Sequence, residues 1–166
     1  MADKNYFVYG GSYSSLAEAQ ADFDAVKTFH SDHTIGSYEE AIFTKGADGK
    51  VDIVNTRTPR RSHGAEWGVA TGALIGVLFP VTFLIGTPLL TGAAGGAILA
   101  NWSKSFGRDD IRKMGEALDQ GQSGVVVVAE VNGDLPVEKL LSRALSTTMA
   151  PIPDAKAVHD HLDENA

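Results

Sequence analysis

The residues from Trp67 to Trp102 form a long stretch without one charged side chain, WGVATGALIGVLFPVTFLIGTPLLTGAAGGAILANW. The two tryptophans of the protein mark its ends. An exposed apolar patch of this size is typical of a membrane-binding or protein-binding surface. We therefore expect lipid or sister subunits to cover it, and a monomer is the least expected arrangement.

Glycines recur at every fourth position in both halves of this stretch. Residues four apart lie on one face of an α-helix, and each glycine costs a helix about 0.5–1 kcal/mol relative to alanine. Close approach of a second helix is the usual compensation. We therefore predict two packed helices, about 64–78 and 88–101, because Pro80 breaks the first. The predicted packing residues are Gly68, Gly72, Gly76, Gly92, Gly96 and Ala100.

The length of these helices leaves the membrane question open. About 15 residues span roughly 22 Å, whereas a bilayer core of about 30 Å needs about 20 residues. A shallow or re-entrant hairpin, a thinned bilayer or no bilayer at all would fit. Basic residues on both sides favour a hairpin whose two feet stay in the cytoplasm, with Trp67 and Trp102 at the interface. Alternatively, the tryptophans cap a hairpin buried between subunits. The basic residues are Arg57, Arg60, Arg61, Lys104 and Arg108, with His63 among them.

The flanking sequence predicts a mixed frame of strands and helices. Ser15 with Glu18 has the form of a capping box, and apolar residues follow at helical spacing. The predicted strands are 6–9, 38–45, 51–55 and 124–131, and the predicted helices are 15–29, one beginning at Asp109 or Asp110, and one beginning at Asp134 with Val137, Leu140, Leu141 and Leu145 on one face. This order predicts an α+β, ferredoxin-like (split βαβ) frame with an inserted glycine-zipper helical hairpin and a C-terminal helix.

The domain organisation follows from this order. We expect one ferredoxin-like domain over residues 1–148, with the apolar hairpin inserted at about 64–102. Residues 149–166 contain two prolines and several acids, and we expect a mobile or docking tail.

Composition excludes several classes of function. The formal net charge of −7 argues against binding to a nucleic-acid backbone, which requires clustered lysine and arginine. The absence of cysteine excludes disulfides, thiol catalysis and thiolate metal sites. The N-terminus lacks the apolar core of a secretory signal, so we expect a cytoplasmic protein, with the inner face of the cytoplasmic membrane as a candidate location.

The pattern resembles a bacterial family of predicted membrane proteins of unknown function, allied to glycine-zipper and general-stress proteins. The residues that carry the resemblance are Arg61, His63-Gly64, Trp67-Gly68, Gly72, Gly76, Leu78-Phe79-Pro80 and the glycines at 92–96. The resemblance covers residues from about 5 to 147. It implies a ferredoxin-like frame with an inserted glycine-zipper hairpin, and it implies no reaction.

Four short segments are candidate sites. Arg60, Arg61 and His63 precede a predicted helix, where they could contact an anion or a lipid head group; a topology signal is the plainer reading. A loop from Gly10 to Ser15 could cradle phosphate but lacks the lysine of a P-loop. His30, Asp32 and His33, and His159 to His161 with Asp163 and Glu164, could hold a metal weakly, but we expect no metal and no cofactor.

These observations favour a non-enzymatic protein that acts through helix packing. The first hypothesis is a membrane-associated or self-assembling scaffold or stress protein. The second is a soluble homo-oligomer, a ring or shell, with the hairpin buried between subunits. The third is a ferredoxin-like module that binds a small ligand on its open sheet face. We expect a homo-oligomer, the lipid bilayer as a candidate partner, and no nucleic acid.

Overall fold

The computed structural model describes residues 5–46, 51–57, 116 and 122–152. The elements are strand β1 (Asn5–Tyr13), helix α1 (Leu16–Ser31), strand β2 (Ile35–Lys45), strand β3 (Val51–Arg57), strand β4 (Ser123–Val131), helix α5 (Val137–Leu140) and strand β5 (Ser146–Pro151). No helix among these residues is long and apolar enough to cross a membrane. The predicted hairpin at 64–102 and the predicted helix after Asp109 lie outside the described residues, apart from Glu116, which is helical.

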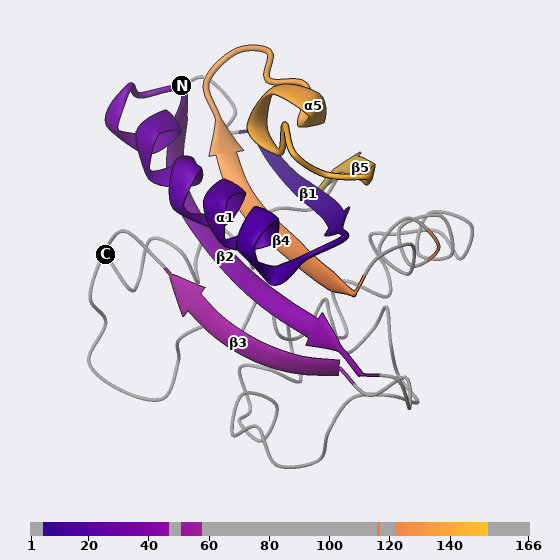
Figure 1. The fold of residues 1–166 in the computed structure, drawn as a ribbon. Helices are drawn as coiled ribbons and strands as arrows, with labels where there is room; N and C mark the ends of the chain where they lie inside the picture. Colours follow the sequence, from indigo (N-terminus) through magenta and orange to yellow (C-terminus); the bar gives the residue numbers. More distant parts are fainter. Residues whose placement is uncertain (1–4, 47–50, 58–115, 117–121, 153–166) are drawn as a thin grey trace, which may run out of the picture.

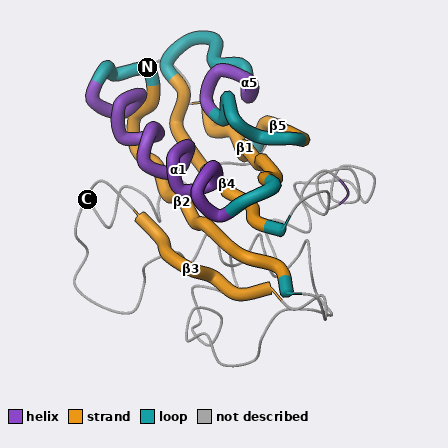
Figure 2. Tube along the Cα trace, viewed as in Figure 1, coloured by secondary structure: helices purple, strands orange, loops and turns teal. Residues whose placement is uncertain are grey.

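The five strands form one sheet in the order β3-β2-β4-β1-β5, and every neighbouring pair is antiparallel. β4 therefore lies at the centre, with β1 and β2 on its two sides. Both helices lie on the same face of this sheet, α1 across β2 and β4, and α5 beside β1 and β5 (Figures 1 and 2).

The predicted ferredoxin-like frame with an inserted helical hairpin is wrong. The described chain is mostly a five-stranded antiparallel sheet, and its two helices have 16 and 4 residues. The C-terminal helix of the prediction is replaced by one helical turn and an edge strand, β5, which pairs with β1. Residues 149–151 of the predicted tail belong to this strand, whereas 153–166 lie outside the described residues.

Contacts made by the backbone after Leu140 explain why the C-terminal helix stops. A helix would continue if each backbone N–H were bonded to the carbonyl four residues earlier. Here the N–H of Arg143 donates to Asp22 Oδ2 at 2.9 Å, and the N–H of Leu145 donates to the carbonyl of Ser12 at 2.7 Å. Tertiary partners thus take the donors that the helix needs, and Leu145, predicted on its apolar face, is exposed.

Helix α1 agrees well with its sequence pattern. Ser15 is the N-cap, and its Oγ accepts a hydrogen bond from the N–H of Glu18 at 3.3 Å. The carboxylate of Glu18 accepts from Ser14 Oγ at 2.7 Å, so only half of the predicted capping box forms as expected. Ala19, Phe23 and Val26 are buried against the sheet.

One strand, β1, runs beyond its predicted limits, and another, β4, agrees with them. β1 continues through Gly10 and Gly11, where the sequence predicted a stop, because both glycines pair with β4 and β5. A Cβ on Gly11 would lie 3.0 Å from the Cβ of Ala144. Glycine at this position therefore lets the segment after α5 approach β1 closely. β4 is buried on both faces from Val125 to Val128, and a continuous apolar run is typical of such a strand.

Candidate functional site

Charged side chains lie between α1 and the sheet, where apolar packing would be expected. Two carboxyl groups there, on Asp22 of α1 and Glu40 of β2, have no exposed surface. Each one is paired with an arginine, Asp22 with Arg143 and Glu40 with Arg57. Together with Tyr13 of β1, these residues form what we call the interface cluster: Tyr13, Asp22, Glu40, Arg57 and Arg143.

The first half of the interface cluster is centred on Asp22. Tyr13 Oη donates to Asp22 Oδ2 at 2.9 Å, and Arg143 Nη1 donates to Asp22 Oδ1 at 2.8 Å. With the N–H of Arg143, three donors from two residues converge on one buried carboxylate. Burial raises the pKa of the Tyr13 hydroxyl above the usual range, and the charge of Asp22 raises it further. Tyr13 therefore acts as a neutral donor.

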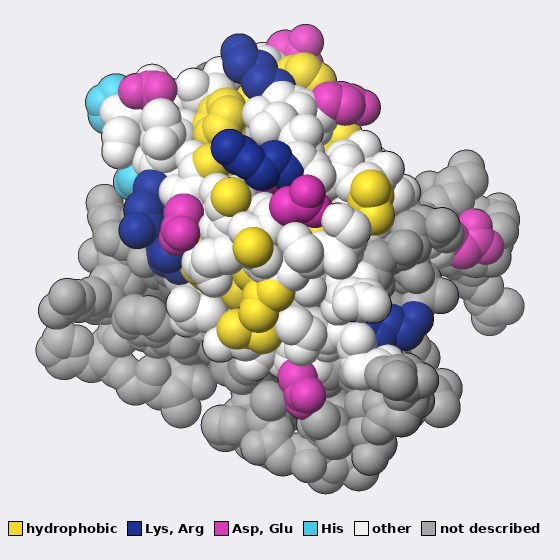
Figure 3. Space-filling view, in the orientation of Figure 1, with side chains coloured by type: hydrophobic (Ala, Val, Ile, Leu, Met, Phe, Trp, Pro, Cys, Tyr) yellow, Lys and Arg dark blue, Asp and Glu magenta, His cyan; other side chains and the backbone are white. Residues whose placement is uncertain are grey.

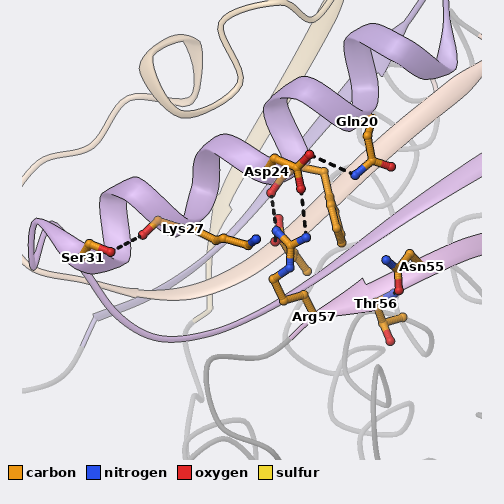
Figure 4. A network of polar contacts seen from close by, with 9 residues as sticks. Gln20, Asp24, Lys27, Ser31, Asn55, Thr56 and Arg57 are labelled. Atoms are coloured by element: carbon orange, nitrogen blue, oxygen red, sulfur yellow. Dashed lines mark hydrogen bonds and ion pairs between the residues drawn. The ribbon is translucent and has the colours of Figure 1, made fainter.

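The second half is centred on Arg57, the last residue of β3. Its Nη2 lies 2.9 Å from Asp24 Oδ1, and its Nη1 lies 3.2 Å from both Glu40 Oε1 and the carbonyl of Phe23. The guanidinium also stacks over the ring of Phe23, 4.3 Å from its centroid. Figure 4 shows the arginine reaching from the edge strand to Asp24 on the helix. The hydrogen bond from Arg57 lowers the pKa of Asp24.

Glu40 is an unusual member of the cluster. Burial raises the pKa of its carboxyl to about 9, because desolvation outweighs the attraction of Arg57. Its Oε2 is buried without a hydrogen-bond partner. Glu40 is therefore protonated and neutral at pH 7, and Asp24 carries the charge that balances Arg57. Since Glu40 is fully buried, the cluster serves as an anchor between α1, β2 and β3.

The surface over α1 is polar and mixed in charge. Acidic and basic side chains alternate across it, and hydrophobic side chains appear there only as small separate spots (Figure 3). The large hydrophobic side chains exposed in the described part are Leu16, Val54, Leu145 and Met149. The helix side of the sheet thus has the character of an ordinary solvated face.

The residues that the sequence placed in the hairpin lie outside the described residues. This applies to the packing set Gly68, Gly72, Gly76, Gly92, Gly96 and Ala100, to Trp67 and Trp102, and to Arg60, Arg61 and His63. Their roles stay predictions. The histidines at 159 and 161 also lie outside the described residues.

Two weaker candidates fall within the described part. The candidate phosphate loop at 10–15 is mostly strand, because residues 10–13 belong to β1, and Ser15 caps α1. His30 lies near the end of α1, and its Nδ1 is 3.0 Å from the carbonyl of Gly36. The described residues contain no group of three or more potential metal ligands, so His30, Asp32 and His33 do not form such a site.

The interface cluster was missed by reasoning from the sequence, although a signal existed. Asp22 lies at helical spacing on the apolar face that holds Ala19, Phe23 and Val26. Glu40 lies between Tyr38 and Ile42 on the same face of β2. A charged residue in the middle of an apolar stripe requires a buried partner.

Comparison with known proteins identifies the family of this chain but assigns it no activity. No curated protein and no solved structure matches the chain significantly. A family model described as a protein of unknown function, DUF1269, matches residues 65–152, more than half of the chain. The predicted membership of an unknown-function family is thereby confirmed, while the glycine-zipper, membrane and stress associations stay predictions. This protein belongs to the family of proteins of unknown function designated DUF1269.

Proposed function

We propose that the protein is a non-enzymatic scaffold that associates with the inner face of the cytoplasmic membrane or with its own copies. The charge-free segment from 67 to 102 is the part of the chain that makes these associations. In this proposal the segment packs through its glycine face, and the described sheet holds the chain before and after it, at Arg57 and Ser123. A role in the stress response belongs to the same proposal and rests on the family resemblance alone.

One observation carries this proposal: both ends of the intervening chain are held in the same sheet. β3 ends at Arg57 and β4 begins at Ser123. Arg57 is level with Val127 of β4, since both pair with Glu40. Ser123 lies four residues from Val127, or about 13 Å, and two strand spacings add about 10 Å sideways. The two ends are therefore about 16 Å apart.

This closeness limits how the segment can meet a bilayer. A chain that leaves and re-enters one small body must return to the side from which it started. This geometry favours a chain that enters and leaves the bilayer on the same side over a single transmembrane pass. The basic residues Arg60, Arg61, Lys104 and Arg108 would then all lie on one side, as the positive-inside rule requires.

The chain is bonded to neighbouring elements both before and after the segment, which suits a sheet that acts as a fixed base. Arg57 is paired with Asp24 of α1 and with Glu40 of β2. At the other end, the N–H of Gln122 donates to the carbonyl of Tyr13 at 3.1 Å, and the carbonyl of Gln122 accepts from Lys45 at 2.8 Å. The sheet is thus a fixed base.

The test is flotation of a detergent-free lysate through a density gradient, with wild type, Gly72→Leu and Ala70→Leu. Position 70 is off the predicted glycine face, so Ala70→Leu matches the size change without blocking the packing. We expect wild type and Ala70→Leu to float with lipid, and Gly72→Leu to lose assembly or lipid association. Sedimentation as a large lipid-free particle would support the soluble homo-oligomer instead. A small lipid-free species, or no effect of Gly72→Leu, would contradict packing through the glycine face.

A further inference from the structure

The dipeptide Asn132-Gly133 forms the turn that follows the central strand β4. Among the asparagines of this chain, only Asn132 is followed by a glycine. An asparagine side chain and the next backbone nitrogen close into a five-membered ring when no side chain hinders their approach. Glycine at the next position removes that hindrance. The pair therefore has the chemistry of a site that modifies itself without an enzyme.

The structure leaves both partners of this ring closure accessible. Asn132 and Gly133 are both exposed. Within the described part of the chain, the N–H of Gly133 makes no hydrogen bond. The φ of this glycine is +101°, and a Cβ built on it would meet no atom within 4 Å. No described group therefore opposes the rotation that brings the nitrogen of Gly133 to the side chain of Asn132.

The residues on both sides of Gly133 are held in place. The N–H of Asn132 donates to the carbonyl of Thr34 at 3.0 Å, and Asn132 Nδ2 donates to the carbonyl of His33 at 3.0 Å. After the turn, Leu135 is only 1% exposed and belongs to the core. The motion that ring closure needs is therefore confined to the short stretch between these two anchors.

We propose that Asn132 deamidates spontaneously in the folded protein and that this reaction loosens the turn between α1 and β2. The backbone nitrogen of Gly133 loses its proton to solvent and attacks Cγ of Asn132. The new C–N bond forms, the Cγ–Nδ2 bond breaks, and ammonia leaves with a proton from solvent. Water then opens the resulting succinimide at either carbonyl, which gives aspartate or isoaspartate. The balance is one water consumed and one ammonia released, with no change of oxidation state.

The side chain of Asn132 supports an unfavourable backbone conformation at His33. His33 has a φ of 59°, in the left-handed region that costs free energy for a residue with a side chain. Its carbonyl accepts Asn132 Nδ2, and the next N–H, of Thr34, donates to the carbonyl of Phe29 at 2.9 Å. A carboxylate at position 132 has no donor to offer and places negative charge beside the His33 carbonyl oxygen. The contact therefore changes from attraction to repulsion.

The isoaspartate product also changes the main chain. Its backbone runs through the former side chain, so the path from β4 to Leu135 gains one atom. The carbonyl of Leu135 accepts from Tyr9 Oη at 2.9 Å, so a longer connection disturbs a contact of the core. Both products add one negative charge to a chain with a formal net charge of −7. The reaction is independent of the proposed scaffold function, because it concerns the turns at one end of the sheet.

The test follows full-length wild type in mildly alkaline buffer, folded and in urea, by peptide mapping with mass spectrometry. Asn55 is the internal control, because it is also exposed but precedes the β-branched Thr56 within β3. In the folded protein we expect Asn132 to convert at least about tenfold faster than Asn55. Asn132→Gln keeps an amide but would have to close a six-membered ring, so it should not convert. Equal rates at Asn132 and Asn55, or conversion at Asn132 only in urea, would overturn the proposal.

Amide hydrogen exchange tests the effect on the turn. Asn132→Asp reproduces one product, and Asn55→Asp adds the same charge to the edge strand β3. We expect the peptide that contains Thr34 to exchange at least about threefold faster in Asn132→Asp than in wild type, and at the wild-type rate in Asn55→Asp. Wild-type protein aged until Asn132 has converted should behave as Asn132→Asp does. Exchange at the wild-type rate in Asn132→Asp, or equal acceleration in both variants, would overturn the loosening of the turn.

Discussion

The carboxylate of Asp22, in the middle of α1, accepts the backbone N–H of Arg143 at 2.9 Å. Asp22 also accepts the side chain of the same arginine at 2.8 Å. A single buried carboxylate thus ends the short helix α5 and turns the chain toward the edge strand β5. The position of β5 beside β1 depends on this contact between residues far apart in the sequence.

Removal of the Asp22 carboxylate should destabilise the protein strongly. Asp22→Ala leaves the hydroxyl of Tyr13 and the N–H of Arg143 without acceptors, and we expect a loss of about 3 kcal/mol. Asp24→Ala is the matched control. Asp24 lies on the same helix as Asp22 and is also paired with an arginine, but it is half exposed. It should cost under about 1 kcal/mol. Urea unfolding followed by circular dichroism measures both, and equal losses would contradict the anchoring role of Asp22.

Glu40 should make stability depend on pH above the normal range of a carboxyl group. The folded chain holds this proton up to about pH 9, whereas the unfolded chain releases it near its ordinary pKa of 4.5. The contribution to stability is therefore complete below about pH 4.5 and is lost as the pH rises toward 9. The slope is at most about 1.4 kcal/mol per pH unit.

The measurement compares the free energy of unfolding of wild type and Glu40→Gln at pH 6.0 and 8.5. The difference between the two proteins cancels the contribution of every group that behaves alike in both. We expect the variant to gain stability relative to wild type by about 1 kcal/mol or more per pH unit. Glu138→Gln, on the surface, serves as control and should show no such gain. A constant difference for Glu40→Gln would show that the Glu40 carboxyl ionises normally.

Lysine at position 57 should keep only part of the stability that Arg57 provides. Arg57→Gln removes the cation that Asp24 and Glu40 share, and we expect a loss of about 2 kcal/mol. Arg57→Lys keeps the charge but loses the planar group that bonds two partners and stacks on Phe23. Its loss should be about half as large. Thermal or urea unfolding ranks the three proteins, and a lysine variant equal to wild type would mean that charge alone matters.

Gly124 and Phe43 should behave as a coupled pair. Gly124→Ala places a methyl group in the space that the Phe43 ring occupies, so the ring must move at a cost of about 1–3 kcal/mol. In the double variant Gly124→Ala/Phe43→Leu, the smaller side chain makes room for this methyl group. The double variant should therefore be more stable than the sum of the single changes, by about 1 kcal/mol in a double-mutant cycle. Additive losses of stability would show that the Gly124→Ala methyl group does not clash with the Phe43 ring.

Local pattern was enough to predict most of the regular structure. The N-cap at Ser15, the helix that follows it, and the buried strand from Ser123 to Val131 all agree with the sequence. These features depend on side chains close in sequence: a capping hydroxyl, apolar residues at helical spacing, and an uninterrupted β-branched run.

Tertiary structure alone decided the C-terminal part and the interface cluster. The apolar spacing of Val137, Leu140, Leu141 and Leu145 indicates a helix, yet Asp22 and Ser12 capture the donors that would continue it. The pKa of Glu40 likewise depends on how deeply α1 buries it and on where Arg57 lies. Sequence by itself determined where α1 and the central strand β4 form, because the capping and spacing preferences behind them are local. Only the folded sheet decided which buried groups meet, because hydrogen bonds and desolvation depend on contacts between distant residues.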